Sequence, residues 1–154
     1  MVAATLTASV ACVATATAGA RVQGAAAITL SSYRAGARPV AVTIAFSAEL
    51  QCGRLAGAPV RLELPARSRV PRAVRSAAVI VDGRRASRVT VAGHVLEIGL
   101  PRPRGAICDV IAPGEAKIFI TRAAAIGNPR APGRYVFVVR HAGDVARGEA
   151  NVRS

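Results

Sequence analysis

Short apolar runs in which every second residue points to the same face are the feature that most restricts the fold of this chain. In residues 39–47, Val42, Ile44 and Phe46 occupy alternate positions, so an extended strand places them on one face. Residues 59–65 repeat the alternation between two prolines, which mark the limits of that strand. No stretch after residue 27 shows the period of an amphipathic helix. The pattern therefore predicts an all-β fold.

Turn signals divide much of the remaining chain into further strands. Asp82-Gly83 and Ala92-Gly93 separate three short apolar runs. Asp-Gly suits a type I′ turn, because both central residues of that turn need a positive φ. We therefore expect a β-meander with strands near 77–81, 86–91 and 94–100.

Four more runs complete the expected strands. Residues 27–33 alternate weakly and residues 115–121 more clearly. Residues 135–140 are apolar on both faces, which is typical of a central strand covered on both sides. Residues 144–152 are only weakly strand-like, and we expect an edge strand there. The total of seven to nine short, mostly antiparallel strands is the pattern of a β-sandwich or a small barrel.

Composition supports one domain with an aliphatic core. A chain of 154 residues buries roughly two-thirds of its unfolded surface around a single core. Hydrophobic residues make up 52% and charged residues 19%, which excludes a disordered chain of low hydrophobicity and high charge. Aromatic residues make up only 3%, so the core must consist of aliphatic side chains, many of them β-branched.

The N-terminal segment has the features of a secretory signal peptide. Residues 2–20 carry no charge and end in small residues, with an A-x-A pattern at Ala18 and Ala20 and another at Ala25 to Ala27. We expect a signal peptide over 1–27, cleaved after Ala20 or Ala27, and a domain over 28–154. A membrane-spanning helix is the weaker alternative, because Ala and Thr gain little from transfer into hydrocarbon. Lipidation of Cys12 is a further alternative, disfavoured because no bulky aliphatic residue stands three positions upstream.

Removal of this leader would leave two cysteines, Cys52 and Cys108, in an oxidising compartment. An even pair there predicts a disulfide. Closing that loop would stabilise the fold by roughly 4 kcal/mol in the chain-entropy model. Both cysteines fall in expected loops, so the bond would link loops rather than facing core strands. Two free buried thiols are the alternative.

The sequence also resembles a known family. Gly133, Tyr135 and Phe137 are spaced as in the tyrosine corner of immunoglobulin-like domains. The phrases VIVDGRRASRV (79–89) and AIGNPRAPGRYVFVV (125–139) resemble the Ig-like modules of bacterial surface-layer and secreted wall-associated proteins. The resemblance covers residues 28–154 and implies an immunoglobulin-like sandwich. The chain has no tryptophan, so the Cys-Trp-Cys core of antibody domains is not expected.

A net charge of +13 arises almost entirely from arginine, since Lys117 is the only lysine. One interpretation is a binding surface for an anionic polymer, such as a cell-wall polymer or nucleic acid. The other is the coding bias of a GC-rich genome, favoured by the dispersion of the arginines and the scarcity of aromatic residues for base stacking. The candidate anion-binding residues are Arg67, Arg69, Arg72, Arg75, Arg84, Arg85 and Arg88.

The residues offer little for catalysis. The eight acidic residues are spread along the chain without a pair suited to general acid and base roles. His94 and His141 have no metal ligands at suitable spacing, and neither a G-x-S-x-G elbow nor a phosphate-binding glycine loop occurs. We expect no catalytic residue, metal or cofactor. The predicted function is a secreted or cell-envelope structural or adhesion module, whose partner is an unknown envelope protein or polymer; the alternative is an electrostatic binder of an anionic polymer.

Overall fold

One continuous sheet of ten strands makes up the fold in the computed structural model, which describes residues 22–48, 58–101, 114–141 and 143–154. Strand β1 runs parallel to β10, and the other neighbouring pairs are antiparallel. The order across the sheet is β5-β4-β8-β2-β1-β10-β9-β3-β7-β6. In chain order the strands are β1 (Val22–Leu30), β2 (Val42–Ala48), β3 (Val60–Glu63), β4 (Val79–Val81), β5 (Arg84–Arg85), β6 (Arg88–Ala92), β7 (Val95–Gly99), β8 (Gly114–Ile120), β9 (Gly133–His141) and β10 (Asp144–Val152).

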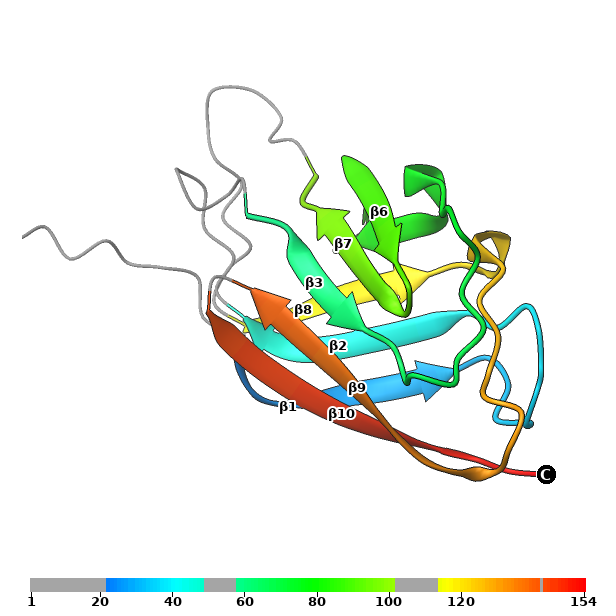
Figure 1. The fold of residues 1–154 in the computed structure, drawn as a ribbon. Coiled ribbons are helices and arrows are strands. Elements are labelled where there is room, and N and C mark those ends of the chain that lie inside the picture. The colour runs from blue at the N-terminus through cyan, green and yellow to red at the C-terminus, as the bar shows by residue number, and fades with distance from the viewer. Residues whose placement is uncertain (1–21, 49–57, 102–113, 142) are drawn as a thin grey trace, which may run out of the picture.

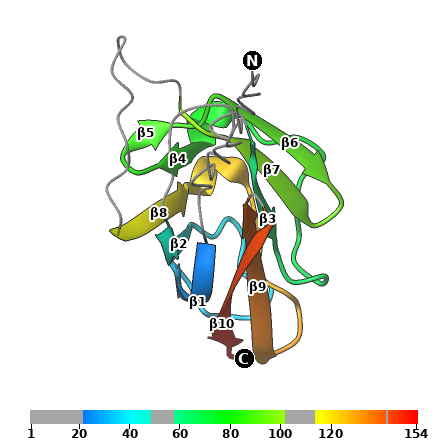
Figure 2. The ribbon, with the colours of Figure 1, turned by 90° about the vertical axis from the view of Figure 1, so that its left-hand side faces the viewer.

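The sheet curls so that its two halves face each other. Viewed from one end, the strands follow a curve with β5 and β6 at its two extremes (Figure 2). In the perpendicular view, β3, β7 and β6 lie in front of β2 and β8 (Figure 1). The inner surfaces of the two halves enclose a single core.

The alternation seen in the sequence supplies this core. In β2, Val42, Ile44 and Phe46 are buried, while Thr43 and Ala45 on the other face are half-buried. Each such aliphatic or aromatic side chain contributes roughly 1.5–3 kcal/mol when it leaves water. The same arrangement in the other strands buries Val60, Leu62, Val79, Val81, Leu96, Ile98, Ile118, Ile120 and Val139.

The all-β prediction is confirmed, but the strand count and the separation into two sheets differ from the expected sandwich of seven to nine strands. Hydrogen bonds between β1 and β10 join the two halves, so ten strands form one sheet. A parallel pair between the first and last strands cannot be read from local alternation, because it depends on residues more than 100 positions apart.

The predicted meander over residues 77–100 is wrong in its pairing. Asp82 and Gly83 have φ values of 46° and 75°, and they form the expected turn between β4 and β5. Strand β6 pairs with β7 in a second hairpin, but β5 and β6 lie at opposite edges of the sheet. Ala86 turns inward and is buried, which ends β5 after two residues and sends the chain across to the other half.

Two expectations about the last strands are also wrong. Strand β10 was expected at an edge, yet it lies between β1 and β9 and pairs with β9 along its whole length. Strand β9 is not covered on both sides, because Val136 on its outer face is 44% exposed. Phe137 and Val139 on the inner face are buried. The Tyr135 hydroxyl donates a hydrogen bond to the Ala131 carbonyl at 2.9 Å, although the immunoglobulin-like sandwich in which the sequence placed it is not formed.

The first strand begins at Val22, earlier than the expected domain boundary at residue 28. Residues 23–25 pair with β10, and residues 26–30 pair with β2 after a register shift. Cys12, Cys52 and Cys108 lie outside the described residues, so the predicted disulfide stays a prediction. Within the described ranges, no helix has the length and apolar character needed to cross a membrane.

Candidate anion-binding end of the molecule

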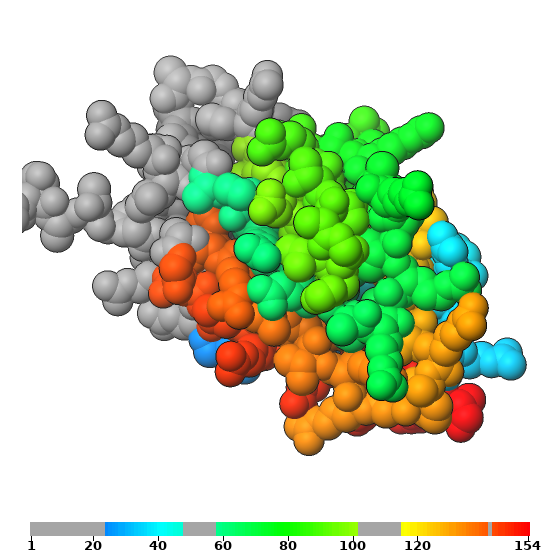
Figure 3. Space-filling view, viewed as in Figure 1, coloured from blue at the N-terminus to red at the C-terminus, as the bar shows by residue number. Residues whose placement is uncertain are grey.

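Four chain segments meet at the end of the sheet where β1, β3, β8 and β10 finish (Figure 1). They are residues 31–41, 65–75, 121–132 and 153–154, and we call them together the arginine end. The space-filling view shows side chains from all four segments projecting around this end (Figure 3). None of the four contains an acidic residue. They carry nine exposed arginines: Arg34, Arg38, Arg67, Arg69, Arg72, Arg75, Arg122, Arg130 and Arg153.

The three longer segments are fixed to one another around Gly127 and Asn128. Gly127 exchanges two backbone hydrogen bonds with Arg69, at 2.9 and 3.0 Å. A side chain at Gly127 would meet the Ala37 carbonyl and the Arg38 Cβ at 3.1 Å, so only glycine fits without displacing its neighbours. The buried Asn128 donates its side-chain amide to the carbonyls of Ser32 and Arg34, at 2.8 and 2.9 Å. The arginines are therefore carried on a defined scaffold of loops.

Further backbone contacts bring arginines from distant segments side by side. Arg34 and Arg153 are partners in a parallel β-bridge, with hydrogen bonds of 2.7 Å from the Arg153 amide to Tyr33 and from the Ala35 amide to Arg153. The Arg38 Nε donates to the Ala125 carbonyl at 3.0 Å. Because guanidinium groups stay charged at any ordinary pH, this arrangement concentrates positive charge at one end.

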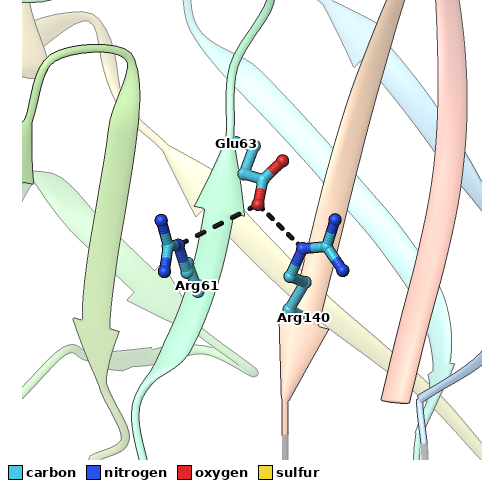
Figure 4. Close-up of polar contacts among 3 residues, drawn as sticks. All are labelled: Arg61, Glu63 and Arg140. Atoms are coloured by element: carbon cyan, nitrogen blue, oxygen red, sulfur yellow. Dashed lines mark hydrogen bonds and ion pairs between the residues drawn. The ribbon is translucent and has the colours of Figure 1, made fainter. Parts of the chain in front are cut away.

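Arginines on the strands have a different environment. On the outer face of β3 and β9, the Arg140 Nε donates to Glu63 at 2.7 Å, and Arg61 lies 3.9 Å from the same carboxylate (Figure 4). Arg134 pairs in the same way with Glu149 across β9 and β10. In the described part of the chain, no ion pair joins a carboxylate to any of the nine arginines. The strands carry eight basic and five acidic side chains, whereas the arginine end carries nine arginines and no acidic side chain.

A shallow pocket of about 280 Å³ lies away from this end, where β9 turns into β10. Arg61, Glu97, Arg140, His141 and Asp144 line it. Burial lowers the pKa of His141 below 6.5, although a hydrogen bond to the Pro59 carbonyl and the charge of Asp144 act in the opposite direction. His141 is 2% exposed, and its Nδ1 has no hydrogen-bond partner within the described ranges. The pocket is lined by both basic and acidic side chains around His141, so its charge favours no single class of ligand.

Among the described residues, Asp82 is the other group, besides His141, whose pKa is shifted. Its Oδ1 accepts a hydrogen bond from the Lys117 amide at 2.7 Å, which extends the pairing of β4 with β8 by one residue. Burial raises the pKa of Asp82 above 3.8, against the effects of that hydrogen bond and of the Lys117 charge. His94 lies exposed in the turn between β6 and β7. The described residues contain no group of three or more His, Cys, Asp or Glu able to hold a metal ion.

Comparisons with known proteins show a similarity in structure but none in sequence. In sequence, no protein family and no curated protein matches the chain. In structure, the fold is similar to that of BslA, a bacterial hydrophobin, with a TM-score of 0.52 and 16% sequence identity. The similarity covers 88% of this chain and 98% of BslA. At this level of identity, it concerns the fold alone.

The structure brings together only part of the predicted anion-binding set. Arg67, Arg69, Arg72 and Arg75 lie at the arginine end, whereas Arg84, Arg85 and Arg88 lie on the edge strands β5 and β6. Sequence reasoning missed five members, because none of them belongs to a run of closely spaced arginines. The sequence does contain a signal that could have identified them: the three loop segments 31–41, 65–75 and 121–132 contain arginines but no acidic residue. The missed residues are Arg34, Arg38, Arg122, Arg130 and Arg153.

Proposed function

We propose that this protein is a non-catalytic structural or adhesion module of the cell envelope that holds an anionic polymer through its arginine end. The observation that carries the proposal is the set of nine exposed arginines with no acidic side chain in the same segments. A surface that carries only positive charge attracts polyanions and raises their association rate. Coding bias explains an excess of arginine, but it does not explain why the acidic residues are absent from all four segments that meet at this end.

Several features support a position outside the cytoplasm. The uncharged leader ends in a cleavage pattern at Ala20, and removal there leaves β1 whole from Val22. Cleavage after Ala27 would instead remove the residues that pair with β10, so we favour Ala20 as the processing site. A Cys52–Cys108 disulfide would suit an oxidising compartment.

The fold agrees with a structural role. An all-β chain similar in fold to a bacterial hydrophobin, with the tyrosine-corner hydrogen bond of Tyr135, supports kinship with envelope modules of Ig-like type. Such a module acts through its surface, and the arginine end is the strongest electrostatic feature of that surface among the described residues.

Salt dependence of binding tests this function. The probe is long-chain inorganic polyphosphate, titrated into the mature protein at several salt concentrations. We expect log K to fall linearly with log salt, with a slope of roughly −0.7 for each phosphate neutralised on a flexible chain. Replacing Arg67, Arg72 and Arg130 with glutamine should weaken binding at least about tenfold at low salt and flatten the slope by about 2.

The matched control replaces Arg85, Arg88 and Arg147 with glutamine, which lowers the net charge by the same amount away from the arginine end. We expect its slope to stay close to that of the unchanged protein. Equal losses in both variants would show that only the net charge matters and would contradict a localised site. A response independent of salt would eliminate electrostatic polymer binding altogether.

A further inference from the structure

We infer, on the basis of the proposed function, that the polymer is a flexible chain carrying phosphodiester or polyphosphate groups, and that it wraps around the arginine end to contact all three longer loops. A rigid duplex or a lipid bilayer would fit this end less well. The inference rests on how the loops distribute charge, on the donor chemistry of arginine, and on the repulsion between neighbouring arginines.

The charges are spread around the end rather than along one face. The loop 65–75 lies in front in Figure 1, 31–41 lies behind it, and 121–132 descends from the top of the end to its lower edge. Within 121–132, Gly127 is hydrogen-bonded to Arg69 of one neighbouring loop, and Ala125 accepts a hydrogen bond from Arg38 of the other. A rigid rod could touch only one side of such an end at a time. A flexible chain can follow the loops and neutralise arginines from each.

Arginine side chains suit phosphate recognition without base recognition. The guanidinium presents a planar fork of donors that matches two phosphate oxygens. The arginine end offers few aromatic side chains on which bases could stack, since Tyr33, which is 38% exposed, is the only aromatic residue in the four segments. We therefore expect contacts to the backbone of the polymer and little dependence on what the backbone carries.

A polymer with closely spaced charges should bind the arginine end more tightly than a polymer with widely spaced charges. Arg34 and Arg153 are held as β-bridge partners, and no acidic side chain of the four segments offsets their repulsion. Like charges held side by side destabilise the fold until an anion screens them. Polyphosphate and single-stranded nucleic acid also release more condensed counterions than a polymer with widely spaced carboxylates. Binding of such a polymer should therefore raise the stability of the folded protein against unfolding.

The experiment compares four probes by fluorescence anisotropy at one low salt concentration: long-chain polyphosphate, single-stranded poly-dT, a DNA duplex of the same length, and polygalacturonate. We expect the two flexible phosphate polymers to bind within a few-fold of each other. The duplex should bind about tenfold or more weakly, because a rigid rod meets the arginines of one side only, and polygalacturonate should bind about as weakly, because it releases fewer condensed counterions. Vesicles of phosphatidylcholine and phosphatidylglycerol form a fifth arm, with weak binding expected. Polyphosphate should raise Tm, whereas orthophosphate at the same phosphate concentration should not, because only a linked chain engages several arginines at once.

Single variants test the wrapping. Arg34→Gln, Arg67→Gln and Arg130→Gln each remove one charge from a different loop, and each should flatten the salt slope for polyphosphate by about 0.7. A flatter salt slope in only one of the three variants would contradict the wrapping. So would duplex DNA that binds as tightly as polyphosphate or more tightly. Polygalacturonate binding as tightly as polyphosphate would overturn the phosphate preference while leaving the proposed function intact. Binding to vesicles alone, or to none of the probes, would overturn both.

Discussion

Asn128 fixes the loop that carries Arg34 and Arg38. Its side-chain amide donates to two carbonyls of residues 32–34, and its backbone amide donates to the Ala37 carbonyl at 3.0 Å. A loop with so little apolar burial depends on such polar contacts for its conformation, because water competes for every free backbone group.

Replacing Asn128 with alanine should therefore destabilise the protein by about 2–3 kcal/mol, since two carbonyls at a half-buried position lose their donor. The free energy of unfolding in urea measures the loss. Asn151→Ala is the control, because Asn151 is exposed on the outer face of β10 and should change stability by less than about 0.5 kcal/mol. Similar losses in the two variants would contradict the anchoring role of Asn128.

His141 should make stability depend on pH. Its pKa is lowered by burial in the folded state, so the fold favours the neutral imidazole. This contribution is fully present above the unfolded pKa of 6.5 and is lost as pH falls from 6.5 through the lowered pKa of the folded state. We expect the free energy of unfolding to fall over that window by up to about 1.4 kcal/mol per pH unit.

The readout is the difference between the unchanged protein and His141→Gln, whose stability should lack this slope. That difference removes the effect of Asp82, whose raised pKa acts in the opposite direction, with stability lost as pH rises. His94→Gln, at an exposed turn, should keep the slope. A slope that persists in His141→Gln would assign the pH dependence to other groups.

At the scale of elements, the union of β1 with β10 converts two sheets into one. Gly148 in β10 makes room for it, because a Cβ there would lie 2.3 Å from the Ala26 carbonyl oxygen and 2.6 Å from the Ile28 Cγ1. The first of these contacts is with backbone, so the strand itself would have to move. The close approach of β1 to β10 therefore requires glycine at this position.

Gly148→Ala should destabilise the fold by roughly 1–3 kcal/mol, as overpacking against neighbouring backbone does. Arg147→Ala, one residue earlier on the exposed face of the same strand, is the matched control and should be nearly neutral. Urea unfolding followed by circular dichroism measures both. Equal stability of the two variants would mean that β1 does not pack on β10 as described.

At the scale of the whole molecule, positive charge is segregated. Three arginines on the sheet faces, Arg61, Arg134 and Arg140, are paired with glutamates, while the loops at one end carry arginines and no acidic side chain. Strand pairing explains the first arrangement, since residues opposite each other on neighbouring strands interact directly. Nothing in the packing requires the second, and this is the reason for proposing that it binds a ligand.

The sequence by itself located most of the strands. Alternation identified β7 and β8 to within one residue at each end and β2 and β3 to within three, whereas the first strand was expected at 27–33 and is β1 at 22–30. Asp82-Gly83 marked its turn, because side-chain direction and turn geometry are local properties. The charge excess was equally visible, although only four of the nine clustered arginines were singled out.

Only the tertiary structure decided which strands are neighbours and which loops share an end. The parallel pairing of β1 with β10 and the separation of β5 from β6 depend on contacts between distant residues, which no local period encodes. Arg34 and Arg153 stand 119 positions apart, yet they become partners because the strands preceding them run parallel. The arginine end exists for the same reason: strands that finish at one edge of a sheet place their loops together.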